Sequence, residues 1–187
     1  MKQYILPAIR LTVVTLVFFC VLYTFVIWAI ARLAPNKGEG ETVSVNGKTV
    51  GYVLEGQHFS NDGYFWSRPS AVGYNAAGSG GSNKGPTNPD YLNDVQARID
   101  TFLVHNPGVK KADIPSELVT ASGGGLDPDL SPAGAKVQVK RVAAARKLPE
   151  ERVSNLVDQS IQKPFLGLFG TERVNVLKLN IELDKLK

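Results

Sequence analysis

Residues 11–31 have the sequence LTVVTLVFFCVLYTFVIWAIA, a run of 21 uncharged residues between Arg10 and Arg32. Because a helix rises about 1.5 Å per residue, a helix of this length matches the roughly 30 Å hydrocarbon core of a bilayer. A secretory signal peptide is the competing interpretation, but its apolar core spans only about 7 to 15 residues. The run therefore predicts a retained transmembrane helix, which we place at residues 11–33 after a short N-terminal tail, residues 1–10.

A single helix satisfies its own backbone in lipid, but it cannot line a polar pathway, which several elements must shield from the acyl chains. We therefore do not expect this chain alone to be a channel or a pump. Thr12 and Thr15 lie on one face of the helix, where they either pack against a neighbouring span or bond back to their own helix carbonyls. Basic residues flank both ends of the run, so charge does not settle its orientation.

Composition removes several classes of function. The 187 residues carry a formal net charge of +4, but three basic residues flank the apolar run, and the rest of the chain has 18 basic and 17 acidic residues. Because basic and acidic residues nearly balance in the rest of the chain, the composition does not predict a nucleic-acid-binding surface. Cys20 is the only cysteine, which excludes an intrachain disulfide, and with two histidines, His58 and His105, it leaves few metal ligands.

Residues 34–41 form a short polar linker, and the domain that follows, residues 42–187, opens with a predicted β-hairpin. Asn46-Gly47 lies between two alternating apolar segments, residues 42–45 and 48–54, and this dipeptide favours a type I′ turn. Alternation also predicts a strand at residues 173–179, and residues 114–121 are expected to be extended.

Three helix starts follow from capping residues and prolines. Asn88-Pro89 begins a helix that ends at Asn106-Pro107-Gly108, Ser131-Pro132 begins a second, and Pro149 begins a shorter third that runs through Ile161. Strands and helices are mixed without a repeated strand–helix unit. The sequence therefore predicts an α+β soluble domain on a single N-terminal transmembrane helix.

Two predicted loops are rich in glycine, residues 67–89 with a centre at residues 78–85, and residues 122–131. Both lack the spacing of phosphate-binding motifs. Counting a P-loop from Gly78 puts Asn83, Lys84 and Gly85 where Gly-Lys-Ser/Thr is required, and the third glycine of a dinucleotide fingerprint falls on Pro128. We interpret both loops as shaped for close backbone approach. The chain also lacks a Gly-x-Ser-x-Gly sequence, and Asp127-Pro-Asp129 is typical of a turn.

The segment Tyr64-Phe-Trp-Ser-Arg-Pro-Ser70 contains three consecutive aromatic residues, which cannot all face one side of a strand. Part of this apolar surface must therefore meet something else. Arg68 either stacks on these rings or holds a carboxylate in a fork. The alternative is that Tyr64 and Trp66 face the core and Arg68 is tied to a local carbonyl, and the sequence supports both interpretations equally.

Beyond this segment, residues 79–89, 119–132, 138–143 and 174–177, together with Asn180 and Asp184, have a distinctive order and spacing. With the aromatic segment and the single N-terminal span, they resemble the C subunit of the bacterial Kdp potassium-transporting ATPase over nearly the whole chain. Lys84 stands where that family usually has an apolar residue, and Asp129 stands where many members have histidine. The second departure weakens any mechanism that needs an imidazole there.

The resemblance implies an accessory, non-pore and non-catalytic subunit of a high-affinity, ATP-driven potassium uptake pump. Its implied partners are a channel-like potassium-translocating subunit, a P-type ATPase subunit and a further small single-span subunit. The family is assigned as a chaperone that raises the ATP-binding affinity of the ATPase subunit, so ATP is expected only through the resemblance, without a recognisable motif. The implied location is the bacterial inner membrane, with the N-terminus inside and the domain in the periplasm. The alternative is a membrane-anchored periplasmic binding or sensing module unrelated to transport.

We expect partner-binding residues in the segments that carry the resemblance, with no catalytic or metal-ligating residues among them, and Thr12 and Thr15 as candidates for helix packing in the membrane. The candidates are Tyr64, Phe65, Trp66, Arg68, Pro69, Asn83, Thr87, Asn88, Asp127 and Ser131.

Overall fold

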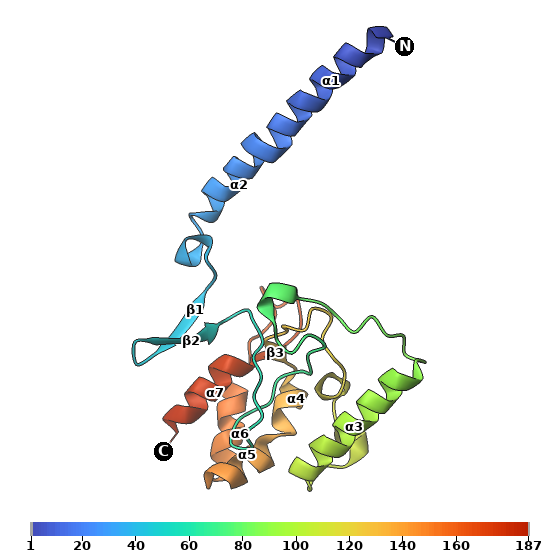
Figure 1. Ribbon diagram of the computed structural model, residues 1–187. Coiled ribbons are helices and arrows are strands. Elements are labelled where there is room, and N and C mark those ends of the chain that lie inside the picture. The colour runs from blue at the N-terminus through green and yellow to red at the C-terminus, as the bar shows by residue number, and fades with distance from the viewer. Residues whose placement is uncertain (1, 187) are drawn as a thin grey trace. The chain divides into compact units, whose positions relative to one another are not determined.

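The computed structural model describes residues 2–186. The described chain divides into two compact units, with the boundary between Thr42 and Val43. The first unit is built on a helix without a break, in which α1 (Lys2–Leu16) continues through the π-helical segment η1 (Val17–Tyr23) into α2 (Thr24–Ala31) (Figure 1). A 3₁₀ turn, η2 (Pro35–Gly38), follows. The helix begins inside the segment predicted as a tail, because residues 3–9 are also uncharged.

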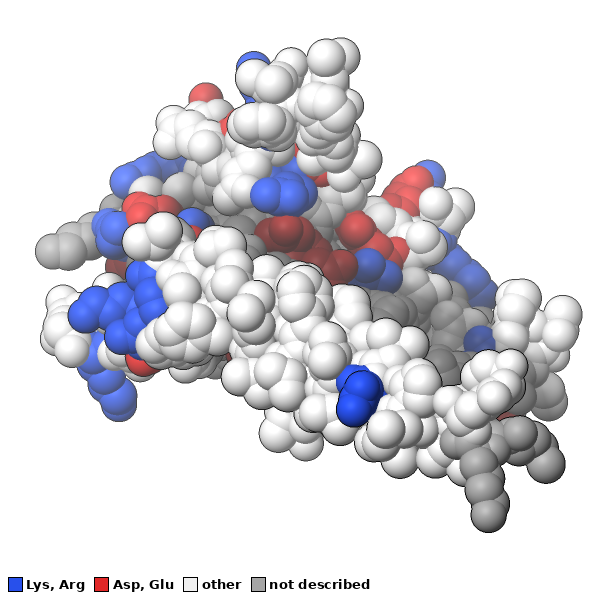
Figure 2. Space-filling view, turned by 90° about the horizontal axis from the view of Figure 1, so that it is seen from above, with Lys and Arg blue, Asp and Glu red and all other residues white. Residues whose placement is uncertain are grey.

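The stretch Gln3–Ala31 is the one described helix that is long and apolar enough to cross a membrane. All side chains from Gln3 to Ile30 are exposed. On the face shown in Figure 2, the surface of this helix is almost entirely uncharged. Thr12 Oγ1 donates to Ala8 O and Thr15 Oγ1 to Leu11 O, both at 2.9 Å. The two threonines thus bond back to their own helix.

The second unit contains two small antiparallel sheets. Strands β1 (Thr42–Val45) and β2 (Lys48–Tyr52) form the predicted hairpin, with Asn46 and Gly47 at φ values of 51° and 77°, as a type I′ turn requires. Strands β3 (Asp129–Leu130) and β4 (Val174–Asn175) pair with Asp129 opposite Asn175 and Leu130 opposite Val174. The sheets are therefore minor elements of this unit.

Helices supply most of the regular structure. They are α3 (Pro89–His105), α4 (Pro132–Lys136), α5 (Val139–Arg146), α6 (Glu150–Gln159) and α7 (Val176–Lys185), with 3₁₀ turns η3 (Ala76–Gly78), η4 (Lys111–Asp113) and η5 (Ser116–Leu118). The three predicted helix starts are confirmed, although the second helix is interrupted between α4 and α5. Together with the two sheets, these helices confirm the α+β class of the domain.

The predictions of two extended segments are wrong. Residues 114–121 contain the turn η5, because Ser116 O accepts from the backbone N–H and from the hydroxyl of Thr120. Residues 173–179 form a strand only at Val174 and Asn175, after which the chain turns into α7. Asn175 Oδ1 accepts from Lys178 N (3.0 Å), so a helix cap ends the strand that the alternation predicted.

The core lies where the last three helices meet the short sheet β3–β4 and the end of α3. Helices α5, α6 and α7 lie side by side, as Figure 1 shows from orange to red. The fully or almost fully buried core side chains are Phe65, Phe102, Leu130, Val142, Val153, Val157, Val174, Leu179 and Leu183. Phe65 is the one residue of this set that comes from a loop, so the aromatic segment passes through the centre of the domain.

Candidate partner-binding site

The aromatic segment crosses the domain as an extended chain without a neighbouring strand. Two buried side-chain amides take the place of that strand. Asn180 of α7 accepts from Phe65 N (2.8 Å) and donates to Phe65 O (3.0 Å). Gln138, which lies just before α5, does the same for Trp66, at 2.8 Å and 3.2 Å. Each amide therefore pairs both backbone groups of one residue, as a strand would.

The three aromatic side chains point in different directions, and the interpretation in which Tyr64 and Trp66 face the core is confirmed in part. Phe65 fills the core, whereas Tyr64 and Trp66 are half-buried at its edge. A guanidinium covers each of these two rings: Arg146 lies over Tyr64 and Arg141 over Trp66, both 4.5 Å from the ring centroid. The surplus apolar surface of the segment is thus covered within the chain.

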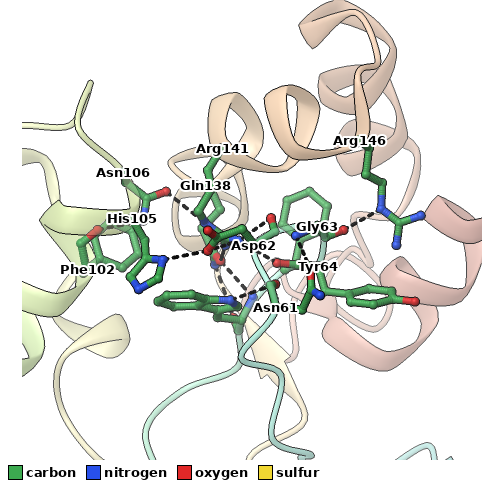
Figure 3. A network of polar contacts seen from close by, with 12 residues as sticks. Asn61, Asp62, Gly63, Tyr64, Phe102, His105, Asn106, Gln138, Arg141 and Arg146 are labelled. Atoms are coloured by element: carbon green, nitrogen blue, oxygen red, sulfur yellow. Dashed lines mark hydrogen bonds and ion pairs between the residues drawn. The ribbon is translucent and has the colours of Figure 1, made fainter.

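Arg141 is the most strongly constrained charged residue of the site (Figure 3). Its Nη1 donates to Asp62 O (2.6 Å) and Tyr64 O (3.0 Å), and its Nη2 donates to Gln138 Oε1 (2.7 Å). Its Nε donates to Asn106 Oδ1 (3.2 Å) at the end of α3. Burial lowers the pKa of Arg141 to about 10, although the nearby Asp62 carboxylate acts in the opposite direction.

A cavity of about 570 Å³ lies beside this network, between the end of α3 and α5. Its polar wall includes His105, whose Nδ1 lies 2.8 Å from Asp62 Oδ1 and whose ring meets the Trp66 ring edge-on with centroids 4.9 Å apart. Apolar side chains such as Val109 and Val137 line much of the remainder. His105 is the last residue of α3, and it is half-buried and part of the network.

Arg68 and Asp127, both predicted site residues, meet in the structure. Arg68 Nη1 donates to Asp127 Oδ2 (2.8 Å), so the carboxylate partner of this arginine lies within the chain. The other carboxylate oxygen, Oδ1, accepts from Asp129 N (3.1 Å), which confirms the predicted turn. Arg68 Nε and Ser67 Oγ are buried without a hydrogen-bond partner among the described residues.

The two glycine-rich loops lie against each other, next to Pro69. Gly80 N donates to Gly124 O (3.0 Å), and Ser122 N donates to Pro69 O (3.0 Å). A Cβ on Gly81 would lie 2.8 Å from Gly123 O, which leaves no room for a side chain. The interpretation that these loops are shaped for close backbone approach is therefore confirmed.

The remaining candidates are separate from the network. Asn88 Oδ1 accepts from Tyr91 N and caps α3, and Ser131 Oγ accepts from Gly134 N and donates to Glu117 Oε1. Asn83 and Thr87 are exposed on the segment that leads into α3, and Asn83 has a φ of 53°. Nothing in the structure shows what these two residues bind.

Several residues that hold the site together were not among the predicted candidates. They are Asp62, His105, Asn106, Gln138, Arg141, Arg146 and Asn180. Gln138 and Asn180 belong to the segments that carry the family resemblance. Their amide side chains among apolar residues were the signal in the sequence that could have identified them as site residues.

Residues 5–185 match the family described as KdpC, K+-transporting ATPase, c chain. A Potassium-transporting ATPase KdpC subunit of Flavobacterium psychrophilum is 59% identical over 183 residues, which are 98% of each chain. The subunit of the same name in Bacteroides fragilis is 55% identical over 98% of this chain and 97% of the relative. That of Caldanaerobacter subterraneus is 48% identical, with 98% and 95% covered.

Replacing Asn180 by leucine should destabilise the domain by roughly 2 to 6 kcal/mol. The substitution keeps the volume of the side chain but leaves the buried N–H and C=O of Phe65 unpaired, at about 1 to 3 kcal/mol each. Urea unfolding of the full-length chain in detergent, followed by tryptophan fluorescence, measures this change. Asn155→Leu on the exposed face of α6 is the matched control and should stay within about 0.5 kcal/mol. A loss below 1 kcal/mol for Asn180→Leu would argue against the amide pairing.

Asp129→Asn should change how stability depends on pH. Burial raises the pKa of Asp129 above its ordinary value, outweighing Arg173 and Asn175, which lower it. The folded chain therefore keeps a proton that the unfolded chain has already released, and ionisation costs the folded state more. The wild type should lose stability relative to Asp129→Asn as the pH rises from below 3.8 through the raised pKa. Urea midpoints of both chains between pH 3 and pH 7 test the sign, and a relative gain of the wild type would show that the ion pair with Arg173 outweighs burial.

Proposed function

Because this chain belongs to the KdpC family, the c chains of K+-transporting ATPases, we propose that it assembles and stabilises the Kdp potassium pump without lining its ion pathway. The observation that carries this proposal is the match over residues 5–185, which includes both the apolar helix and the α+β domain. A single membrane-spanning helix cannot shield a polar ion pathway from lipid, and this supports a role outside the pore.

The apolar helix supports a membrane anchor. It has 29 residues, and its side chains from Gln3 to Ile30 are exposed in the described chain. Lipid or helices of other subunits would therefore cover them. We propose a single pass through the bacterial inner membrane, with the N-terminus in the cytoplasm and the domain in the periplasm. Its partners are the channel-like subunit, the P-type ATPase subunit and a further small single-span subunit.

We attribute any effect on ATP binding to the assembled pump. The glycine-rich loops are poor phosphate sites, since Gly80 N and Gly125 N already donate to carbonyl oxygens of the domain. Arg141 uses all three of its nitrogens in bonds to the chain. These residues do not fit a nucleotide, so a higher ATP affinity of the ATPase subunit would arise through contacts between subunits.

Assembly is tested by co-purification and by transport. The tagged full-length chain should retain the channel-like and ATPase subunits through detergent extraction and gel filtration, and deleting it should abolish high-affinity potassium uptake by cells. The purified chain alone should hydrolyse no ATP above a buffer blank. A chain that elutes alone, together with unimpaired uptake in the deletion strain, would favour the alternative, an anchored binding or sensing module.

Topology is tested with a reporter that folds only outside the cytoplasm. Alkaline phosphatase fused after Leu54, within the second unit, should be active, whereas a reporter that is active only in the cytoplasm should be silent at the same position. The proposed orientation predicts this pair of results, because Leu54 would be exported. A silent phosphatase together with an active cytoplasmic reporter would place the domain in the cytoplasm.

A further inference from the structure

A small apolar loop between α6 and β4 is the most exposed hydrophobic feature of the second unit. The loop comprises residues 164–170, with the sequence PFLGLFG. Four large apolar side chains lie within five consecutive residues, and their exposed fractions are 71% for Phe165, 73% for Leu166, 80% for Leu168 and 65% for Phe169. Elsewhere in the described part of this unit, Val50, Tyr52 and Leu54 near the hairpin are 38%, 42% and 71% exposed, and Leu92 and Val104 are exposed singly.

Backbone hydrogen bonds within the loop close it into a compact turn. Phe165 N donates to Phe169 O (2.9 Å) and Phe169 N to Phe165 O (3.0 Å), while Gly167 N donates to Pro164 O (2.9 Å). The turn is thus closed on itself, and these bonds fix the backbone that presents the four apolar side chains.

Leu166 is an unusual choice for its position. Its φ is 54°, in the left-handed region that favours glycine or asparagine, yet it carries a large exposed side chain. Turn formation alone does not account for a leucine there. A residue held under strain with its side chain presented to the outside is typical of a contact site.

The exposed area is large enough to anchor a protein interface. Two phenylalanines and two leucines at these exposures present on the order of 500 Å² of apolar surface, which is more than half of the roughly 800 Å² that one partner buries in an interface of standard size. Phenylalanine is enriched in protein–protein interfaces, and a few buried anchor residues account for most of the energy of such interfaces.

The charge pattern favours a protein crevice over a lipid surface. Residues 164–171 contain no charged residue, no tyrosine and no tryptophan, and Lys163 and Glu172, with opposite charges, flank them. Segments that bind the lipid headgroup region combine apolar residues with tryptophan, tyrosine and an excess of lysine or arginine. An uncharged apolar centre with charges at its rim is the pattern of a protein–protein contact.

We propose that the apolar loop is a docking element that inserts into an apolar crevice on another subunit of the same pump. This proposal rests on the proposed function, because it takes its partner from the assembly to which the family belongs. It adds the surface that makes the contact and the chemistry of the partner, an uncharged crevice that receives phenylalanine and leucine side chains.

The test compares two variants of the full-length chain in the co-expressed complex. Phe165→Ser with Phe169→Ser removes both aromatic anchors, and co-purification of the other subunits should fall at least about tenfold while the melting temperature of the chain is unchanged. Leu54→Ser with Val104→Ser is the matched control, because these side chains are 71% and 76% exposed elsewhere in the unit, and it should co-purify like the wild type. Unchanged co-purification of the loop variant would overturn the proposal. Failure of the wild type to co-purify would instead refute the proposed function.

A photo-reactive amino acid at Leu168 identifies the occupant directly in native membranes. A covalent adduct with another pump subunit supports the proposal. Adducts with lipid alone, or no adduct with any pump subunit, overturn it, and the first of these results assigns the loop to the bilayer surface. Because Leu168 is exposed and contributes no side-chain hydrogen bond, this substitution leaves the turn intact.

Discussion

The pairing of two side-chain amides with the extended aromatic segment is the constraint on which the domain depends. Asn180 and Gln138 each accept from the N–H and donate to the C=O of one residue, Phe65 and Trp66 respectively. A domain with only short strands has no sheet into which this segment could fit, and its backbone groups would otherwise be buried without partners. The two amides thus fix α7 and the start of α5 to the same loop.

Arg141 extends this constraint to a third helix. It shares Gln138 Oε1 with the backbone of Trp66, lies over the Trp66 ring, and reaches Asn106 at the end of α3. A buried guanidinium is costly unless each of its donors is used, and here each of its three nitrogens donates. The shift of its pKa to about 10 leaves it charged at neutral pH, so the network keeps its ionic character.

Local signals in the sequence predicted the elements whose cause is local. The Asn46-Gly47 turn and the helix starts at Asn88 and Ser131 depend on the residues at those positions, and they appear as expected. The strand predicted at residues 173–179 failed because Val176, Leu177, Leu179 and Leu183 also fit a helical period, and the cap at Asn175 decides between the two. Partners far apart in sequence, such as Arg68 with Asp127 or Phe65 with Asn180, could not be derived from spacing. For the same reason the sequence could not separate the candidate site residues that hold the domain together from those that remain exposed.

The structure separates two kinds of apolar surface that look alike in the sequence. The aromatic segment around Phe65 is covered inside the domain by guanidinium groups and helices, so its apolar character serves the fold. Two apolar features are exposed and are not covered by any described part of the chain: the helix Gln3–Ala31 and the apolar loop at residues 164–170. The two uncovered apolar features differ in shape, because one has the length of a bilayer and the other is a compact closed turn. The proposed assembly in a membrane accounts for both of them.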